Sequence, residues 1–440
     1  MRVGVISLGC PRNLVDSEVM LGSLKKEGFE IADIKSGVDA CIVNTCAFVN
    51  SAREESVDVV LEAAQLKKEG RIKYLIVCGC LPQLYKEKLA RQLSEADLIL
   101  GTNDFPRIAS FLKKLKKGER LISVSRSLRY LYDESSPRIT LTPKHYAYVK
   151  ISEGCSNLCS YCIISRLRGA FRSRSIRSVI KEVTGLSKSG DLKEVNLIGQ
   201  DTTLFGMDRY GSFKLSRLLK DLCGLKNSVR WIRVLYTHPA HYTDELISTI
   251  SGEGKICKYL DLPIQHISDK ILARMNRHTT RKNITALIEK LRNYIPGLVL
   301  RTSIIVGFPG ETERDFRELL SFVRQVRFER LGAFIYSEEA DTKAAAFKGK
   351  IPERIKSQRY DELMKLQQGI SSSINRSFLG KTIEVLIDEK DGDSFSGRTQ
   401  GDAPEIDGAV HVKGRKIKVG EFTSLRITDT LEYDLIGEAV

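Results

Sequence analysis

The sequence predicts an α/β protein made of three successive folds: a doubly wound parallel sheet, a partial (β/α) barrel and a small all-β barrel. Over the first 117 residues, short apolar runs alternate with amphipathic stretches. From His145 onward, further apolar runs are each separated by a helical stretch. Towards the C-terminus, the pattern changes to a period-two alternation that Gly and Asp turns interrupt.

The N-terminal part contains four short expected strands, rich in Val, Ile and Leu, at residues 2–9, 39–46, 73–80 and 96–102. Helical periodicity occupies the stretches between them, at residues 13–28, 49–70 and 82–93. Strand–helix alternation of this kind favours a parallel sheet with helices on both faces. We therefore expect a doubly wound domain at 1–117, followed by a polar, Ser- and Arg-rich linker at 118–140.

The central part, expected at 141–374, contains six further strands. They lie at residues 145–152, 193–200, 229–236, 257–265, 298–308 and 331–337. Six repeats suit a parallel sheet that is bent into an incomplete barrel. A long amphipathic stretch at 352–378 leads out of it.

The C-terminal part, expected at 375–440, contains only strands. Alternating segments lie at residues 381–390, 395–400, 409–414, 422–428 and 431–440. Five short alternating strands with Gly and Asp turns predict a small closed β-barrel.

The composition is that of a globular protein, with 42% hydrophobic and 28% charged residues. No stretch approaches the roughly 18 apolar residues that a membrane span needs. The first residues indicate a strand rather than a signal peptide. We therefore expect a cytoplasmic protein with no membrane partner. Its ten cysteines would be reduced there, so grouped cysteines favour metal binding over disulfides.

The net charge of +15 is unevenly distributed along the chain. Residues 1–117 carry +3, the middle segment carries +16 and residues 375–440 carry −4. The basic core suits an anionic partner such as RNA. The acidic barrel, which includes the stretch DEKDGD at 388–393, suits a basic protein instead. The alternative is that these charges are simply solvated.

The strongest chemical signal is a CxxxCxxC motif formed by Cys155, Cys159 and Cys162. It follows the first strand of the expected barrel, and active sites of such barrels lie at the C-terminal ends of the strands. Ferredoxin-type motifs supply four ligands. Three thiolates on a four-iron cluster leave one iron open to bind a small molecule. The alternatives are a zinc site, which favours four ligands, and three incidental cysteines.

Three further cysteines, Cys10, Cys46 and Cys80, each stand at the C-terminal end of an expected N-terminal strand. Such strand ends converge on one crevice in an open α/β sheet. A shared cluster of thiophilic iron and three incidental cysteines are equally consistent with this spacing. Four other cysteines are interpreted as buried small apolar residues: Cys41, Cys78, Cys223 and Cys257.

The phrase YVKISEGCSNLCSYCIISRLRGAFRSR, residues 148–174, resembles the radical SAM methylthiotransferases along its whole length. The resemblance extends over the entire chain. It implies an N-terminal methylthiotransferase domain, a central barrel of the radical S-adenosylmethionine (SAM) type and a C-terminal TRAM-type barrel. It further implies two 4Fe–4S clusters, one at the CxxxCxxC motif and an auxiliary one at the N-terminal cysteines, with no catalytic residue beyond the clusters. One SAM then donates a methyl group and a second SAM supplies a radical.

By the same resemblance, the adenine of SAM lies against an aromatic residue and an apolar turn. Tyr161 precedes the third cysteine of the motif and would pack near adenine. Ile305, Val306 and Gly307 end the fifth core strand, where this family places an apolar turn against the base.

The polar end of SAM has its own expected contacts in this family. Gly199, Gln200 and Asp201 end the second core strand, where the family contacts the SAM amino group. Arg174 would bind the SAM carboxylate. Each of these signals is weak alone, because an ordinary strand-end loop has the same form.

Two branches of this family differ in substrate. One modifies isopentenyladenosine in tRNA, and the other modifies an aspartate of small-subunit ribosomal protein number twelve. Several short sequence segments resemble those of the second branch: LGCPRN, IGQDTTLFG, VLYTHP, DLPIQH and APEIDG. The acidic barrel also favours a basic ribosomal protein over RNA. The expected partners are therefore this ribosomal protein and a reducing electron donor such as a flavodoxin or ferredoxin.

Two other classes of function are less consistent with the sequence. An iron–sulfur electron carrier would not need a large barrel with SAM-type strand ends. A nucleic-acid scaffold would concentrate positive charge and aromatic residues on its small barrel, which this chain does not do.

Overall fold

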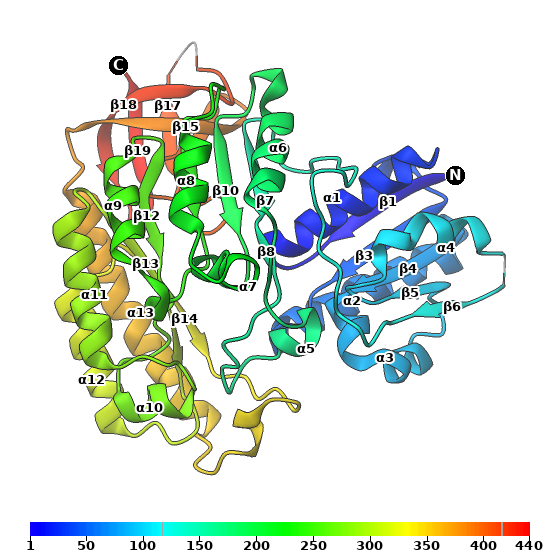
Figure 1. Ribbon diagram of the computed structural model, residues 1–440, viewed down its shortest axis with the longest axis horizontal. Helices are drawn as coiled ribbons and strands as arrows, with labels where there is room; N and C mark the ends of the chain where they lie inside the picture. The colour runs from blue at the N-terminus through cyan, green and yellow to red at the C-terminus, as the bar shows by residue number, and fades with distance from the viewer. Residues whose placement is uncertain (117, 415–416) are drawn as a thin grey trace. The chain divides into compact units, whose positions relative to one another are not determined.

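The chain folds into two compact units, which a computed structural model describes over residues 1–116, 118–414 and 417–440 (Figure 1). The first unit comprises Met1–Leu141, Lys150–Leu158 and Cys162–Val179. The second comprises Thr142–Val149, Cys159–Tyr161 and Ile180–Val440. The second unit thus holds most of the central part together with the C-terminal barrel. The domain boundaries expected from the sequence stay a prediction.

A six-stranded parallel sheet forms the first unit, in the order β2-β1-β3-β4-β5-β6. Its strands are β1 Arg2–Ser7, β2 Glu30–Ile31, β3 Ala40–Thr45, β4 Tyr74–Gly79, β5 Leu98–Leu100 and β6 Leu121–Ser123. Because β1 lies between β2 and β3, the sheet is doubly wound with its switch point between β1 and β3. The predicted fold of this part is confirmed.

Helices connect these strands, as the periodicity predicts. They are α1 Pro11–Lys26, α2 Asn50–Lys68, α3 Cys80–Gln92 and α4 Ile108–Lys114, with the short 3₁₀ helices η1 Ile34–Ser36 and η2 Phe105–Arg107. Strands β3 and β4 are buried along their whole length, which explains their continuous apolar sequence.

Two strands of this sheet, β2 and β6, have no counterpart in the predicted set. Both are short and partly exposed, so they carry little apolar signal. Strand β6 lies inside the segment expected to be a linker and pairs with β5 at the edge of the sheet. That segment therefore contributes to the folded unit.

A second parallel sheet, in the order β14-β13-β12-β11-β10-β7, has six strands, as predicted. The strands are β7 Tyr146–Lys150, β10 Glu194–Ile198, β11 Trp231–Val234, β12 Ile256–Asp261, β13 Val299–Val306 and β14 Arg330–Ile335. A two-stranded antiparallel sheet precedes β10, with β8 Ser152–Glu153 and β9 Arg172–Ser173. The expected open, parallel and partial barrel is confirmed.

Helices alternate with these core strands. The longer ones are α6 Ile176–Leu186, α8 Leu215–Cys223, α9 Asp244–Gly252, α11 Arg281–Tyr294, α12 Glu313–Val326 and α13 Glu353–Arg376. Short helices fill the loops: α5 Ile164–Arg168, α7 Met207–Tyr210, α10 Asp269–Arg274, η3 Ser187–Ser189, η4 Thr202–Leu204, η5 Pro239–His241 and η6 Lys343–Ala346. Among the described helices, none is long and apolar enough to cross a membrane.

The C-terminal strands close into a five-stranded barrel in the order β15-β16-β17-β19-β18, as predicted. They are β15 Thr382–Asp391, β16 Ser394–Arg398, β17 Val410–Lys413, β18 Phe422–Thr430 and β19 Leu435–Ala439. Inward-facing residues such as Val385, Ile387, Val412 and Leu425 form its core. The period-two alternation of the sequence thus separates the interior of the barrel from its surface.

The loop between β16 and β17 anchors this barrel to the core sheet of the same unit. Asp402 forms an ion pair with Arg330, the first residue of β14, with Nη2 and Oδ1 2.6 Å apart. The Tyr259 hydroxyl on β12 donates to Asp407 over 2.6 Å. These two contacts lie at the beginning of β14 and in the middle of β12 rather than at the carboxyl ends of those strands.

Candidate iron–sulfur and SAM-binding sites

The N-terminal trio, Cys10, Cys46 and Cys80, lies at the carboxyl ends of three adjacent strands of the first unit. Cys10 directly precedes α1, Cys46 directly follows β3, and Cys80 is the first residue of α3 after β4. Strands β1, β3 and β4 are neighbours in the sheet, and the switch point lies between the first two. The structure thus brings the three sequence-distant cysteines to the crevice in which such sheets bind ligands.

Two glycines with positive φ allow the cysteine loops to approach one another. Gly9 has φ +83°, and a Cβ there would lie 2.8 Å from the sulfur of Cys46. Gly79 has φ +97°, and its Cβ would lie 2.7 Å from the carbonyl oxygen of Thr45. Each glycine therefore supplies a left-handed turn and the space for the neighbouring loop. Three thiols at neighbouring strand ends, in loops that glycines allow to approach one another, fit a metal cluster with one open iron.

Two arginines contact the sulfurs of the N-terminal trio. Arg12 Nε lies 3.5 Å from the Cys10 sulfur, and Arg168 Nη2 lies 3.5 Å from the Cys80 sulfur. Burial alone would raise the pKa of Cys10, but the charge and hydrogen bond of Arg12 lower it below the ordinary value. Burial raises the pKa of Cys46 to about 11, and that of Cys80 in the same direction. Bound iron would hold such thiols as thiolates.

The other cysteines of this sheet differ in position from the trio. Cys41 and Cys78 lie within β3 and β4 and are fully buried. Burial raises the pKa of both thiols. Their interpretation as small apolar core residues is consistent with this burial, as it is for Cys257 in β12. Cys223 ends α8 and is only half-buried, so the burial expected for it is wrong.

The CxxxCxxC loop lies between β8 and α5, directly after the first core strand as predicted. The backbone N–H of Cys155 donates to the Gly169 carbonyl over 3.1 Å, and the N–H of Ile164 donates to the Cys162 sulfur over 3.5 Å. All three cysteines of the motif are half-buried. Cys155 and Cys162 belong to the first unit and Cys159 to the second, so their joint ligation of one cluster stays a prediction.

Two residues expected near adenine meet in one apolar cluster of the second unit. Tyr161 and Ile305 both pack, partly buried, against a core that contains Phe308 and Tyr336. They are far apart in sequence, and the family resemblance places both near adenine. Their convergence supports an apolar surface at the strand ends, where a purine could stack.

The turn after β13 is organised by a buried carboxylate, Glu311. Its Oε2 accepts hydrogen bonds from the N–H groups of Gly307 and Phe308, at 2.6 and 3.1 Å. Its Oε1 lies 3.0 Å from Arg359 on α13. Gly307 has φ +75°, and Val306 before it is fully buried as the last residue of β13. The segment SIIVGFPGET contains Glu311, but the role of Glu311 in holding this turn is seen only in the folded structure.

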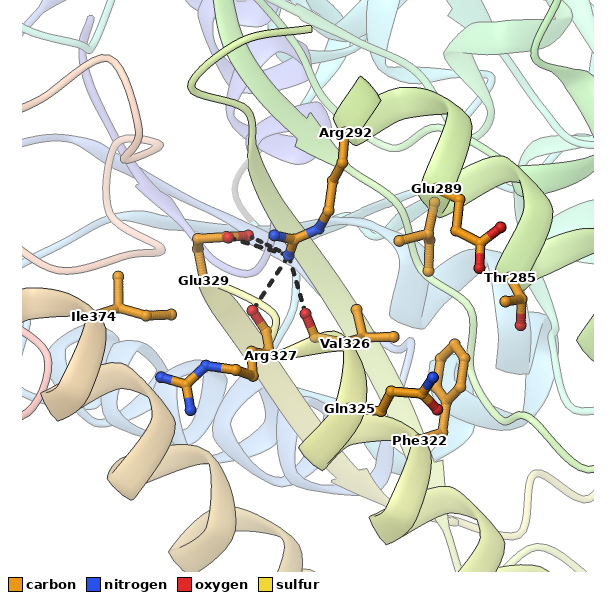
Figure 2. A pocket seen from close by; sticks show the side chains of 10 residues that line it. Thr285, Glu289, Arg292, Phe322, Gln325, Val326, Arg327, Glu329 and Ile374 are labelled. Carbon is orange, nitrogen blue, oxygen red and sulfur yellow. Dashed lines mark hydrogen bonds and ion pairs between the residues drawn. The ribbon is translucent and has the colours of Figure 1, made fainter. Parts of the chain in front are cut away.

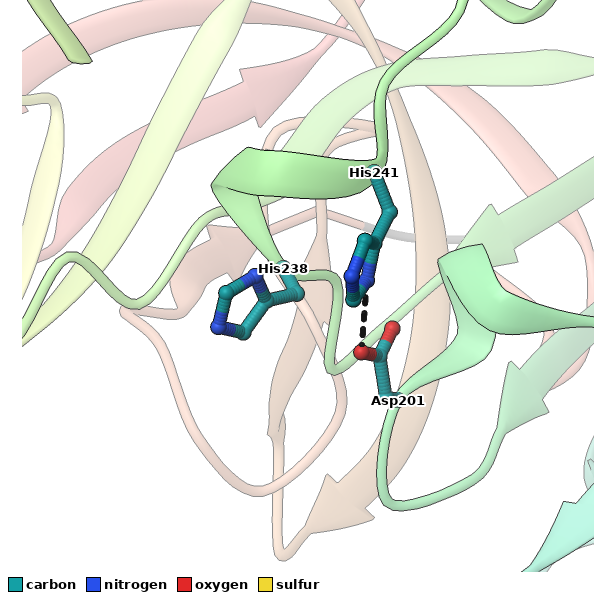
Figure 3. Close-up of side chains that lie close together, drawn as sticks. All are labelled: Asp201, His238 and His241. Carbon is teal, nitrogen blue, oxygen red and sulfur yellow. Dashed lines mark hydrogen bonds and ion pairs between the residues drawn. The ribbon is translucent and has the colours of Figure 1, made fainter. Parts of the chain in front are cut away.

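Gly199, Gln200 and Asp201 directly follow β10, and Asp201 organises the loop there. Its carboxylate accepts from the Thr203 N–H and hydroxyl over 3.1 and 2.6 Å, and lies 2.9 Å from His241 Nδ1 (Figure 3). Burial alone would raise the pKa of Asp201, but the hydrogen bond and charge of His241 lower it. The carboxylate therefore shapes the strand-end loop from within.

Asp201, His238 and His241 lie close enough together to suggest a metal site, with ligand atoms within 4.8 Å of one another. However, His238 Nδ1 accepts the Ala240 N–H over 3.2 Å, and the two imidazole rings stack with centroids 4.7 Å apart. Figure 3 shows His241 directed at Asp201 and His238 turned aside. This arrangement is that of a loop-capping cluster rather than of converging metal ligands.

Three buried polar side chains that the sequence did not indicate lie near these strand ends or, for Asn196, in the middle of β10. His238 Nε2, Arg277 Nε and both amide atoms of Asn196 have no hydrogen-bond partner within the described part of the chain. Arg277 Nη1 lies 3.7 Å from the sulfur of Cys159. Burial, and then the charge of Arg277, lower the pKa of His238 to about 2, so its imidazole is neutral. Buried polar groups of this kind require a polar partner, which a bound ligand can supply.

Arg174, expected to bind the SAM carboxylate, is buried and engaged elsewhere within the first unit. Its Nη1 donates to the Lys150 carbonyl over 3.1 Å and its Nη2 donates to the Ser178 hydroxyl over 2.8 Å. The guanidinium also lies over the ring of Tyr132, 4.5 Å from its centroid. The expected role therefore requires Arg174 to exchange these contacts, and it stays a prediction.

The acidic barrel uses some of its carboxylates to bind the core. Asp388 lies 2.9 Å from His145 Nε2 and 2.6 Å from Arg398 Nε, so it is not a free surface charge. Asp402 and Asp407 are likewise paired with core residues, as described above. By contrast, Glu389, Asp391 and Asp393 are exposed around the β15–β16 hairpin turn. The interpretation of residues 388–393 as one free acidic surface is thus corrected at Asp388.

A surface pocket of about 410 Å³ lies between α11, α12 and α13 (Figure 2). Arg292 spans it, donating to the carbonyls of Val326 and Arg327 over 3.2 and 3.3 Å and pairing with Glu329. These partners precede β14, so the pocket lies at the opposite end of that strand from the SAM-type strand ends. It contains none of the predicted site residues.

Family models match three regions of the chain. They are the Uncharacterized protein family UPF0004 at residues 2–101, the Radical SAM superfamily at 149–323 and the TRAM domain at 379–440. The Ribosomal protein uS12 methylthiotransferase RimO of Geobacter sulfurreducens is 47% identical over 442 residues, covering 100% of this chain and 98% of that protein. The chain belongs to the RimO family. The resemblance to radical SAM methylthiotransferases is therefore confirmed.

Other RimO proteins match the chain equally from end to end. Those of Heliobacterium modesticaldum and Syntrophotalea carbinolica are 45% and 48% identical, covering 100% of this chain and 95% and 97% of their own. Both carry the uS12 name, which agrees with the branch indicated by the sequence phrases rather than with the tRNA-modifying branch.

Solved structures show the fold of this RimO-family chain at low identity. The radical S-adenosylmethionine methyltransferase TsrM from Kitasatospora setae aligns with a TM-score of 0.56 at 13% identity, covering 89% of this chain and 79% of TsrM. The cobalamin-dependent radical enzyme OxsB aligns with a TM-score of 0.52 at 12% identity, covering 84% of this chain and 56% of OxsB. Both likenesses concern the fold alone.

Proposed function

We propose that this RimO-family chain inserts a methylthio group at the β-carbon of an aspartate in small-subunit ribosomal protein uS12. One SAM serves as methyl donor and a second as radical source. The proposal rests on the 47% sequence identity with a uS12 methylthiotransferase over the whole chain. The cysteine trio at the switch point of the N-terminal sheet supports it.

The proposed cluster ligands are Cys155, Cys159 and Cys162 for the SAM-binding 4Fe–4S cluster and the N-terminal trio for the auxiliary one. When bound, these clusters supply the electron that cleaves SAM and the sulfur that is transferred to substrate. The half-buried position of the CxxxCxxC cysteines supports ligand access to that loop. The glycine-lined crevice around the trio supports the second assignment.

The proposed SAM pocket uses the apolar and polar strand ends described above. Tyr161 and Ile305 would contact adenine, since both pack on the same apolar cluster. Glu311 holds the turn at Gly307, and the buried Val306 supports that turn from beneath. These contacts would orient the nucleoside and exclude water from it.

Polar groups would bind the methionyl end of SAM and the substrate. Gly199 and Gln200 follow β10, beside the loop that Asp201 orders. His238 and Arg277 offer buried N–H donors without a protein partner among the described residues. We assign the SAM amino end to the β10 loop, and we retain Arg174 as a carboxylate ligand that rearranges on binding.

Docking of the ribosomal protein is proposed to involve the exposed acidic hairpin turn of Glu389, Asp391 and Asp393. Exposed carboxylates at a hairpin turn attract a basic partner. We further propose a cytoplasmic reaction, in which thiols stay reduced, and an electron donor such as a flavodoxin or ferredoxin.

The experiment is mass spectrometry of uS12 and of tRNA from a strain lacking this chain and from the same strain complemented with it. We expect one methylthio group on a uS12 aspartate only in the complemented strain. A complementation-dependent methylthio group on tRNA isopentenyladenosine, with unmodified uS12, would contradict the proposal and favour the tRNA-modifying function.

A further inference from the structure

Arg168 is a buried cation that belongs neither to the proposed cluster ligands nor to the proposed SAM contacts. It is the last residue of α5, the short helix that begins shortly after Cys162, and it is only 5% exposed. It lies within the segment 148–174, on which the family resemblance is based. A fully charged side chain buried at this depth requires compensating partners.

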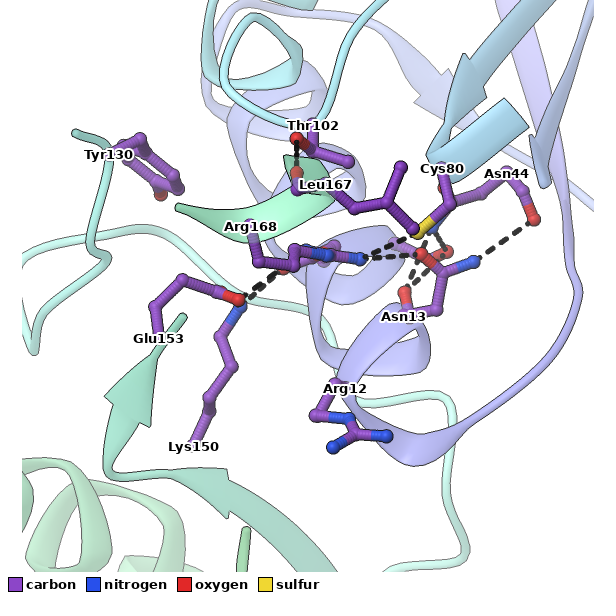
Figure 4. A network of polar contacts seen from close by, with 12 residues as sticks. Arg12, Asn13, Asn44, Cys80, Thr102, Tyr130, Lys150, Glu153, Leu167 and Arg168 are labelled. Carbon is purple, nitrogen blue, oxygen red and sulfur yellow. Dashed lines mark hydrogen bonds and ion pairs between the residues drawn. The ribbon is translucent and has the colours of Figure 1, made fainter. Parts of the chain in front are cut away.

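The Arg168 guanidinium connects Cys80 to the helix that follows Cys10 (Figure 4). Nη2 donates to the Cys80 sulfur over 3.5 Å and to Asn13 Oδ1 over 3.1 Å. Nη1 donates to the carboxylate of Asp16. Asn13 and Asp16 both lie on α1, whose first residue directly follows Cys10. Arg168 therefore joins two of the three cysteine loops.

Asn13 extends this connection to the third loop. Its Nδ2 donates to the carbonyl of Leu8 over 2.7 Å and to the carbonyl of Thr45 over 3.2 Å. Leu8 lies shortly before Cys10, and Thr45 directly precedes Cys46. Because the amide nitrogen faces these acceptors, Oδ1 is the atom that accepts from Arg168. Asn13 and Arg168 together contact the loops of all three cysteines.

Buried charges fix the orientation of Arg168. Asp16 also binds the Lys150 ammonium, with Nζ and Oδ1 2.6 Å apart, and Lys150 in turn lies 2.5 Å from Glu153. Two carboxylates and two cations balance one another, so the burial of each charge is compensated. A planar guanidinium can bind Asp16 through one nitrogen and both Asn13 and Cys80 through the other. A lysine ammonium has only one nitrogen and cannot make this set of contacts.

We propose that Arg168 and Asn13 form a clamp that sets the spacing of the N-terminal trio and raises the reduction potential of the cluster it holds. This inference rests on the proposed function only in that the trio binds an iron–sulfur cluster. A hydrogen bond from a cation to a ligand sulfur favours the more negative, reduced state of a cluster. Loss of that bond lowers the potential, and loss of the clamp loosens the ligand set.

The test uses the full chain with Cys155, Cys159 and Cys162 changed to Ala, so that only the auxiliary cluster is loaded by anaerobic reconstitution. Two clamp variants are made in this background: Arg168→Lys, and Arg168→Met combined with Asp16→Asn. The double variant removes one cation and one anion together, so the buried group stays neutral. The matched control is Arg166→Met, an exposed arginine on the same helix. The readouts are iron content, the rate of iron release to a chelator and the midpoint potential.

We expect about four irons in the background and in the Arg166 control. Both clamp variants should have a lower midpoint potential than the control and release iron several-fold faster. The Lys variant keeps the buried charge, so its altered potential cannot come from an unpaired Asp16. A potential and release rate equal to the control in both clamp variants would overturn the clamp while leaving the cluster assignment intact. Absence of iron from the background itself would overturn the cluster assignment and the clamp with it.

Discussion

Arg398 of the C-terminal barrel and Glu194 of the core form a buried ion pair, with Nη1 and Oε2 2.8 Å apart. Glu194 also accepts from Arg233 Nε over 2.8 Å. The barrel is therefore attached to the core through compensated buried charges as well as through its apolar contacts. Removal of Glu194 is strongly destabilising, because Arg233 then stays buried without a charged partner among the described residues, whereas Arg398 keeps its pair with Asp388.

Replacement of Glu194 by Gln should accordingly lower the free energy of unfolding by about 3 kcal/mol. The control is Glu384→Gln, which removes an exposed barrel–core pair with Arg230 and should cost less than about 1 kcal/mol. Urea unfolding of both variants checks the prediction. Equal, small effects would mean that the buried pair does not stabilise this attachment.

Asp388 should make the stability of the protein depend on pH in the acidic range. Burial alone would raise its pKa, but the hydrogen bond from His145 and the charge of Arg398 lower it below the ordinary value. A lowered pKa contributes stability that is present above the unfolded value of about 4 and is lost as the pH falls through the folded value. Asp388→Asn should therefore be less stable than the wild type at neutral pH, and the difference should vanish in strong acid. A difference independent of pH would contradict this.

The exposed hairpin acids should contribute to substrate association. Changing Glu389, Asp391 and Asp393 to Gln or Asn should slow association with purified uS12, and added salt should slow the wild type in the same direction. Asp388 is left unchanged because it binds His145 and Arg398. Stopped-flow binding measures the rate. An unchanged rate for uS12, with tighter tRNA binding by the variant, would count against a protein substrate.

Cys41 and Cys78 should be dispensable for iron binding, because they lie inside strands rather than at their ends. Their replacement by Ala should leave the iron content unchanged and cost about 1 kcal/mol of stability through the small cavity created. Iron analysis after anaerobic reconstitution checks this. A loss of about half of the iron in either variant would make that cysteine a cluster ligand.

Much of the architecture could be predicted because each long strand carries a continuous or alternating apolar pattern. Strands β2 and β6 escaped prediction because they are short and partly exposed, so packing rather than sequence decides them. The N-terminal trio could be located because the carboxyl ends of parallel strands share one crevice.

Other features of the site depend on contacts that no local pattern encodes. Arg168 lies far along the chain from Asn13 and Cys80, and the clamp exists only once the fold brings them together. The charge pattern was misleading for a similar reason. Asp388 stands in an acidic stretch of sequence, but His145, 243 positions away, is its partner in the folded chain.

The two cysteine trios should differ in the activity that each supports. The enzyme with Cys10, Cys46 and Cys80 changed to Ala is incubated anaerobically with SAM, a reductant and uS12, and 5′-deoxyadenosine and methylthiolated uS12 are both measured. We expect SAM cleavage to continue while no methylthiolated uS12 forms, because only the sulfur-carrying site is lost. Methylthiolated uS12 formed by this triple variant would show that the N-terminal trio does not carry the transferred sulfur.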